Sequence, residues 1–277
     1  MKIVNEINQY LSWYDSINGD IGFVPTMGAL HKGHISLVET SIKNNKFTVV
    51  SIFVNELQFG KNEDFDKYPR TYDEDIEKLS KLKVDVVFVP QHDEIYPQNF
   101  SISIAEETLS RKIEGVARPN FFGGVLTVVS LLFNIIKPRR AYFGEKDLQQ
   151  LIVIKKMVAD LKYPIQIVSV KTMREKSGLA ISSRNQYLNE HEQNEAKIIY
   201  ECLIQAKAKI LGQAQIKTIK HEMIARLKSK EMRVDYVSFV RLNSFQELSG
   251  VAVFPLAICV AVWYKQVRLI DNIIIKE

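Results

Sequence analysis

The sequence has few of the features that mark secreted or membrane-spanning proteins. Its only two cysteines, Cys202 and Cys259, lie far apart, so neither a disulfide framework nor a thiolate zinc site is expected. The longest apolar stretch, residues 125–136, is broken by Ser130 and Asn134 and is far shorter than the ~20 residues of a membrane span. The first 16 residues lack a basic segment followed by an apolar run, so no signal peptide is expected. These absences predict a cytoplasmic protein without a membrane partner.

Neither sign of charge dominates. The chain has 37 basic and 32 acidic residues, a net charge of +5 and 46% hydrophobic residues, which is the composition of a globular protein and not of a disordered one. A small positive excess suits a nucleoside triphosphate and other small anions. Because the basic residues form no block or stripe, no nucleic-acid partner is expected.

Short apolar runs alternate with segments of helical periodicity through the first two-thirds of the 277 residues. Strands that are apolar on both faces and separated by helices predict a parallel sheet covered on both sides. We expect strands at 21–25, 47–54, 84–90, 141–144 and 165–170, and helices at 34–44, 72–82, 125–136 and 147–161.

The pattern changes after residue 184. We expect two helices, at 190–211 and 216–230, and three strands, at 235–241, 256–264 and 267–275, of which the last two form a hairpin. The predicted fold class is therefore α/β. A Rossmann-like parallel-sheet domain spans residues 1–186, and a smaller α+β lid domain spans residues 187–277.

The most informative stretch runs from Pro25 to His34, between the first expected strand and the first expected helix. Gly28 permits a sharp turn, and Gly33 permits close approach of a ligand to the backbone at the helix start. Free N–H groups and the helix dipole favour phosphate there, and His31 and His34 would face the same ligand. A His-x-x-His pair alone is more often structural or an adventitious metal site. The whole string, however, resembles the phosphate-binding element of the nucleotidyltransferase superfamily, which includes the class I aminoacyl-tRNA synthetases.

Four further strings resemble one family of that superfamily, pantothenate synthetase, also called pantoate–β-alanine ligase. With the histidine motif they occur in the order and spacing of the family, and the similarity extends from about residue 20 to the string at 269–272. They are residues 53–59 with 68–71, 114–119, 143–150 and 178–185.

Read from the residues alone, the same strings suit a nucleotide and a hydroxy acid. Asn55 and Gln58 follow a strand end, where amides can donate to and accept from a hydroxy acid, although loop capping is the alternative. Lys146 could be a solvated charge, but beside a phosphate site it becomes a charge clamp. Gln150 lies one helical turn further on, on the same side.

The resemblance implies an ATP-dependent ligase that joins pantoate to β-alanine through pantoyl-adenylate, in coenzyme A biosynthesis. It implies ATP and Mg²⁺ as requirements and a homodimer, and no residue is assigned as a metal ligand. His34 would be the proton donor, acting with His31, Lys146 and Arg184, and the loops 60–70 and 182–184 would be candidate lids. The implied ATP-binding residues are Pro25, Met27, Gly28, His31, Gly33, His34, Gly144, Lys146, Asp147, Met173, Ile181, Ser182, Ser183 and Arg184. The implied substrate-binding residues are Asn55, Gln58, Arg118 and Gln150.

The chain departs from the family pattern at three places. Phe121 stands where the family usually has histidine, Gly123 where it has arginine, and Ser177 where it commonly has aspartate. Roles of the first two positions therefore cannot be carried over. Two other functions stay open: a nucleotidyltransferase that moves AMP to a phosphorylated small molecule, and a non-enzymatic RNA-binding relative of a synthetase. The latter would use lysines 207, 209, 217, 220 and 228.

Overall fold

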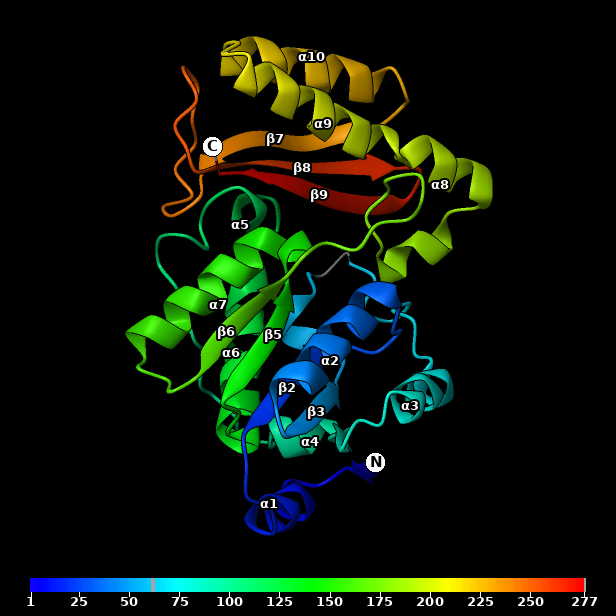
Figure 1. Ribbon diagram of the computed structural model, residues 1–277, viewed down its shortest axis with the longest axis vertical. Helices are drawn as coiled ribbons and strands as arrows, with labels where there is room; N and C mark the ends of the chain where they lie inside the picture. Colours follow the sequence, from blue (N-terminus) through cyan, green and yellow to red (C-terminus); the bar gives the residue numbers. More distant parts are fainter. Residues whose placement is uncertain (61–62, 277) are drawn as a thin grey trace. The chain divides into compact units, whose positions relative to one another are not determined.

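The computed structural model describes residues 1–60 and 63–276. By their internal contacts these residues form two compact units (Figure 1). Unit 1 consists of Met1–Arg111, Arg118–Glu145 and Gln150–Lys171, and unit 2 of Lys112–Ala117, Lys146–Gln149 and the chain from Thr172 onward. Among the described residues, no helix combines the length and the apolar character needed to cross a membrane.

Unit 1 is built on a six-stranded sheet in which every neighbouring pair is parallel, and this confirms the predicted fold class. The sheet order is β1-β4-β3-β2-β5-β6. All five expected strands are present, and β1 is an addition that the sequence pattern did not reveal. The strands are β1 (Lys2–Val4), β2 (Ile21–Thr26), β3 (Phe47–Ile52), β4 (Val86–Phe88), β5 (Arg140–Gly144) and β6 (Gln166–Val170).

Helices cover both faces of this sheet. Successive strand residues point to opposite faces: Val24 of β2 packs in one cluster with Leu37 and Val38 of α2, whereas Phe23 meets Phe133 of α6 ring to ring. The helices of this part of the chain are α1 (Ile7–Asp15), α2 (Lys32–Asn44), α3 (Tyr72–Lys81), α4 (His92–Ile95), α6 (Phe121–Ile136) and α7 (Leu148–Asp160).

The strand order reverses at β2, which pairs with β3 on one side and β5 on the other. In open parallel sheets, ligands bind at such a switch point, beyond the carboxyl ends of the strands. The histidine motif follows β2 there, and the short 3₁₀ helix η1 (Glu56–Gln58) follows β3. The sequence motifs therefore lie where this fold places its ligand site.

Unit 2 contains an antiparallel sheet in the order β7-β8-β9. The expected helix 190–211 is wrong as one element, because it is interrupted at Lys197, and the apolar periodicity on both sides of Lys197 carries no sign of the break. The elements are α8 (Glu190–Ala196), α9 (Ile198–Leu211), α10 (Ile216–Lys228), β7 (Arg233–Arg241), β8 (Leu256–Tyr264) and β9 (Val267–Ile275), with the short α5 (Glu114–Ala117) from earlier in the chain.

The predicted division at residue 186 differs from the division by contacts. Residues 172–186 cluster with unit 2, since Arg174 forms a two-pronged ion pair with Asp271 of β9. Two earlier segments, Lys112–Ala117 and Lys146–Gln149, also belong to unit 2. A single boundary in the sequence cannot represent such an arrangement.

Candidate active site

The turn after β2 has its backbone fixed by buried side chains. The Thr26 hydroxyl donates to the Ser51 carbonyl at 2.7 Å and accepts from the Gly28 N–H at 3.2 Å. Gly28 has φ +81°, a conformation that glycine adopts without steric cost. The glycine expected to allow a sharp turn therefore does so.

Asp75 of α3 holds the next part of this turn. Its two carboxylate oxygens accept from the N–H groups of Ala29 at 2.8 Å and Leu30 at 2.7 Å, and its side chain is 1% exposed. Lys78, one turn further along α3, donates to the Leu30 carbonyl at 3.0 Å. Ala29 has φ +49°, which is unfavourable for a residue with a Cβ. The Asp75 carboxylate thus stabilises a strained backbone conformation.

The two histidines form the start of α2. His31 is the N-cap, with its Nδ1 accepting from the Gly33 N–H at 3.1 Å, while Nδ1 of His34 accepts from the His31 N–H at 3.4 Å. The rings stack with centroids 4.0 Å apart. A Cβ at Gly33 would lie 2.9 Å from the His31 ring, so a side chain there would displace that ring. Because both Nδ1 atoms accept, the hydrogen bonds assign each neutral ring's hydrogen to Nε2, which makes that atom a donor suited to phosphate.

The Asn55 side chain makes its hydrogen bonds to other groups of the protein. It is 1% exposed, its Nδ2 donates to Gln58 Oε1 and to the Gly124 carbonyl, both at 3.1 Å, and its Oδ1 accepts from the Tyr96 hydroxyl at 2.7 Å. Burial and the charge of Glu56 raise the pKa of Tyr96 above its ordinary value, which keeps the phenol as a donor. Asn55 was expected to bind substrate, whereas its contacts are those of a residue that orients Gln58.

Gln58 brings two of the predicted motifs together. Its Oε1 faces Asn55, and its Nε2 lies 2.8 Å from the Met27 sulfur. An expected substrate residue and an expected ATP residue are therefore in contact. The orientation of the amide leaves the N–H₂ end directed toward the histidine motif, as a donor for an oxygen ligand.

Gly124 of α6 sets the position of η1. A Cβ at this residue would lie 2.1 Å from the Leu57 carbonyl oxygen and 2.6 Å from the Gln58 nitrogen. Helix and loop therefore pack backbone to backbone. At the neighbouring Gly123 a Cβ would make only ordinary contact, at 3.7 Å.

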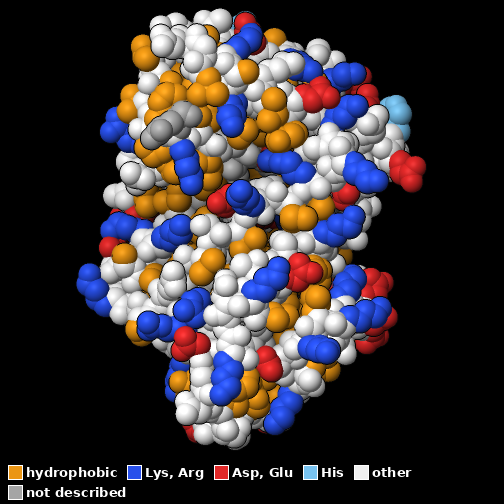
Figure 2. Space-filling model, viewed as in Figure 1, with side chains coloured by type: hydrophobic (Ala, Val, Ile, Leu, Met, Phe, Trp, Pro, Cys, Tyr) orange, Lys and Arg blue, Asp and Glu red, His pale blue; other side chains and the backbone are white. Residues whose placement is uncertain are grey.

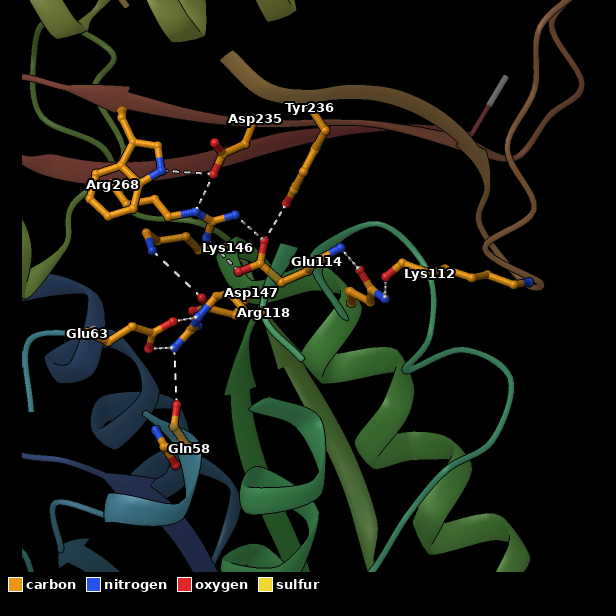
Figure 3. Close-up of polar contacts among 12 residues, drawn as sticks. Gln58, Glu63, Lys112, Glu114, Arg118, Lys146, Asp147, Asp235, Tyr236 and Arg268 are labelled. Atoms are coloured by element: carbon orange, nitrogen blue, oxygen red, sulfur yellow. Dashed lines mark hydrogen bonds and ion pairs between the residues drawn. The ribbon is translucent and has the colours of Figure 1, made fainter. Parts of the chain in front are cut away.

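Arg118 is held beside Gln58 (Figure 3). It forms two hydrogen bonds with the Glu63 carboxylate, at 2.7 and 2.5 Å, and donates to the Gln58 carbonyl at 3.1 Å. Its guanidinium lies 3.8 Å from the centre of the Phe121 ring. The phenylalanine that departs from the family pattern thus forms a stacking surface for Arg118. Of the predicted lid loop 60–70, residues 61 and 62 lie outside the described residues.

Other predicted residues fall in both units. Gly144 ends β5 and Gln150 is half-buried in the first turn of α7, both in unit 1. In unit 2, the Lys146 ammonium lies 3.8 Å from Asp147, and the Ser182 hydroxyl caps η3 (Ser183–Tyr187) by accepting from the Arg184 N–H at 3.3 Å. The Ile181 N–H donates to the Met173 carbonyl at 3.0 Å.

The string at 114–119 has a second use, in unit 2 (Figure 3). Glu114, 5% exposed, accepts two hydrogen bonds from Arg268, at 2.7 and 2.9 Å, and one from the Tyr236 hydroxyl at 2.8 Å. Gln149 accepts from the Glu114 N–H at 3.1 Å. A buried carboxylate satisfied in this way ties the segment Lys112–Ala117 to the antiparallel sheet.

Sequence reasoning missed Asp75, Lys78, Tyr96 and Gly124 as residues of the site. Asp75 is one of three acidic residues in the first turn of α3, where acidic side chains are favoured by the helix dipole alone. The local signal that distinguishes Asp75 is its position one helical turn before Leu79, on the buried face of α3. Among the described residues, no group of three or more His, Cys, Asp or Glu side chains is arranged to hold a metal ion.

A parallel sheet whose switch point carries a glycine turn and paired histidines at a helix start has the architecture of a nucleotide-binding enzyme domain. The sequence model of the family described as pantoate–β-alanine ligase matches residues 2–274. Pantothenate synthetase from Thermosipho africanus is 47% identical over 256 residues, covering 92% of each chain. The enzyme of the same name from Fervidobacterium nodosum is 44% identical, covering 99% of each.

Solved structures agree. The crystal structure of pantothenate synthetase from Thermus thermophilus has a TM-score of 0.92 at 39% identity and covers 99% of both chains. That of pantoate–β-alanine ligase from Francisella tularensis, a complex with β,γ-ATP and β-alanine, has a TM-score of 0.82 at 36% identity and covers 99% of this chain and 97% of its own. The chain therefore belongs to the pantoate–β-alanine ligase family and is an enzyme of that kind.

Proposed function

We propose that the enzyme condenses pantoate with β-alanine at the cost of ATP, through a pantoyl-adenylate intermediate. The observation that carries the proposal is the contact between Gln58 and Met27, a residue of the same motif that carries the stacked pair His31–His34. It joins an amide suited to a hydroxy acid to a helix start suited to a triphosphate, within unit 1. A relative supports the same chemistry, since the Francisella tularensis enzyme was solved in complex with β,γ-ATP and β-alanine.

In the first step a carboxylate oxygen of pantoate attacks the α-phosphorus of ATP. An O–P bond forms, the bond to the bridging oxygen of the β-phosphate breaks, and pyrophosphate leaves with the electron pair. Such a step needs in-line placement and stabilisation of the charge on the leaving group more than covalent help. In the second step the amine of β-alanine attacks the acyl carbon, AMP leaves, and the new amide nitrogen loses a proton.

The proposed role of each side chain follows from the hydrogen-bond donor groups that it carries. The Nε2–H groups of His31 and His34 donate to phosphate oxygens, so both histidines act as neutral donors, and His34 need not transfer a proton. Gln58 donates from Nε2 to an oxygen of pantoate, with Asn55 fixing its amide, and Gln150 binds the same acid. Arg118, whose charge is matched by Glu63, holds the Gln58 backbone.

Residues of unit 2 complete the proposal. Lys146, Ser182, Ser183 and Arg184 bind the triphosphate and oppose its charge, with Asp147, Met173 and Ile181 around the nucleotide. Gly144 of unit 1 belongs to the same proposed nucleotide site. Mg²⁺ enters as part of the substrate MgATP, since this ion is usually bound through substrate phosphates and keeps several waters. The homodimer and the cytoplasmic location stay predictions.

One face of the molecule bears on the RNA-binding alternative. On the face drawn in Figure 2, Lys and Arg side chains are scattered and form no stripe. Two of the lysines that would serve it are paired, Lys209 with Glu222 and Lys220 with Glu247.

Exchange of labelled pyrophosphate into ATP tests the two-step reaction. Enzyme, MgATP and pantoate should support exchange without β-alanine, and no exchange should occur without pantoate. Exchange that is independent of pantoate would point to an adenylylated enzyme instead. If pyrophosphate is released too slowly for exchange, a single-turnover quench should still recover pantoyl-adenylate. Failure of both measurements, with AMP formed only when all three substrates are present, would contradict the intermediate.

A further inference from the structure

Two adjacent polar residues of β9 have no part in the function proposed above. Asp271 and Asn272 are 4% and 6% exposed in a strand of mostly apolar residues. Buried polar side chains are costly unless their hydrogen-bonding groups are satisfied. Their partners therefore indicate what the pair does.

Asp271 binds Arg174. The guanidinium donates from Nη1 to Oδ2 at 2.6 Å and from Nη2 to Oδ1 at 2.9 Å. It also donates to the Gly178 carbonyl at 3.2 Å and stacks 3.9 Å from the centre of the Tyr200 ring. A planar fork with all these partners is fixed in one orientation.

Arg174 lies in a tight hairpin that leads into Ser182. Arg174 bridges to Ala180, and the Ile181 N–H donates to the Met173 carbonyl. The hairpin turns at Gly178, with φ +96°, where a Cβ would meet the Tyr200 ring at 2.4 Å. The hold of Asp271 on Arg174 thus fixes the start of the loop Ser182–Arg184.

Asn272 binds the other phosphate element of unit 2. Its Nδ2 donates to the Lys146 carbonyl at 2.9 Å, across 126 residues of sequence. Its backbone N–H donates to Asp271 Oδ1 at 2.7 Å, so the Asp271 carboxylate also holds the backbone of Asn272. Neighbouring residues of one strand therefore hold Lys146 and the approach to Ser182–Arg184.

We propose that Asp271 and Asn272 are positioning residues that fix Lys146 and the loop Ser182–Arg184 in the one arrangement that binds the triphosphate. The proposal rests on the proposed function, in which those elements bind ATP. Donors from separate segments stabilise phosphate charge only when they are held in place before the reaction. Misplacement by about 1 Å can cost on the order of 10²-fold in rate.

The test compares Asn272→Ala and Arg174→Lys with Ile258→Val. Arg174→Lys keeps the positive charge and loses the two-pronged hydrogen bonding of the guanidinium. Ile258 is fully buried in β8 and contacts neither Arg174 nor Lys146 through a hydrogen bond, so Ile258→Val controls for a loss of stability. Affinities for ATP and for pantoate are measured by calorimetry, and turnover by pantothenate formation. Each test variant should bind ATP at least tenfold more weakly and bind pantoate within about twofold of the wild type. The control should change neither affinity.

A double-mutant cycle separates positioning from general destabilisation. If Asn272 acts through Lys146, Asn272→Ala should lower turnover of the wild-type enzyme but hardly lower the turnover of the Lys146→Ala variant. In the same way, Arg174→Lys should lower turnover of the wild type but hardly that of the Arg184→Ala variant. Equal losses for both ligands, unchanged ATP affinity, or additive effects in both cycles would overturn the proposal. If Asn272→Ala does not fold, the Arg174 cycle decides. A failure of the proposed function can be told apart from a failure of this proposal, because the wild type itself would then show no pantoate-dependent pyrophosphate exchange.

Discussion

The Asp75 carboxylate accepts a hydrogen bond from the Leu30 N–H at 2.7 Å, across 45 residues of sequence. Its other oxygen takes the Ala29 N–H, so one buried side chain determines the turn that precedes the histidines. The conformation of this turn is a property of the packed unit and not of the turn sequence alone. Ala29, at φ +49°, would relax without that carboxylate.

Asp75→Asn should lower turnover by about 10²-fold, because an amide offers one acceptor for two N–H groups and the turn then shifts the histidines. ATP affinity measured by calorimetry should fall as well. Asp73→Asn is the matched control, since Asp73 lies in the same helical turn and is exposed. If Asp75→Asn turns over at the wild-type rate, the role of Asp75 in positioning the histidines is contradicted.

His31→Ala and His34→Ala should each reduce turnover by about 10²–10³-fold, which is typical of the loss of one preorganised donor. His31→Ala also removes the N-cap of α2, so it should lower stability by about 1 kcal/mol more. Steady-state rates and thermal denaturation measure the two effects. A histidine whose alanine variant turns over like the wild type has no part in the chemistry.

Gln58→Ala and Gln150→Ala should weaken pantoate binding far more than ATP binding, because both amides are assigned to the hydroxy acid. Each variant is titrated with ATP and with pantoate. Asn55→Ala should resemble Gln58→Ala, since Asn55 orients that amide. Equal losses for the two ligands would contradict the assignment.

Gly124→Ala and Gly123→Ala form a matched pair in one helix. At Gly124 the added Cβ would lie 2.1 Å from the Leu57 carbonyl oxygen, so the backbone must move, at a cost of about 1–3 kcal/mol, and Gln58 moves with it. Gly123→Ala has room and should be stabilising by up to about 1 kcal/mol. Urea denaturation and the KM for pantoate distinguish them, and similar behaviour of both variants would refute the close packing.

Both cysteines should be unreactive in the folded enzyme. Burial raises the pKa of Cys259 to about 12 and raises the pKa of Cys202, so neither forms the nucleophilic thiolate near pH 8. Titration with a chromogenic disulfide reagent should show no fast thiol in native protein and two in concentrated urea. A fast native thiol would show that one side chain reaches solvent.

Elements whose cause is local are predictable from the sequence. The β-branched run of β3 and the apolar run of β2 predicted strands correctly, and the string from Pro25 to His34 predicted a turn and helix start at a sheet end. Contacts with distant partners are not predictable in this way. Asp75 acts on residues 45 and 46 positions away, and Asp271 binds Arg174 across 97, separations for which a single sequence carries no signal.

Asn55 shows a different limit. Its position after β3 is the correct place for a ligand-binding amide, yet 1% exposure and four internal hydrogen bonds give it another task. The residue type and spacing of Asn55 resemble those of Gln58. Only the packing of Tyr96 and α6 distinguishes the two.

The three-segment composition of unit 2 also bears on protein synthesis. Glu114 leaves the ribosome 154 residues before its partner Arg268, a delay of roughly 8–30 s at usual rates of translation. During that time a carboxylate destined for burial, and the Lys146 backbone that Asn272 later holds, have no partner strand. The parallel sheet can form as the chain emerges, but the antiparallel unit must wait for β9. A nascent chain that stalls before β9 would therefore carry the histidine motif without a completed second unit.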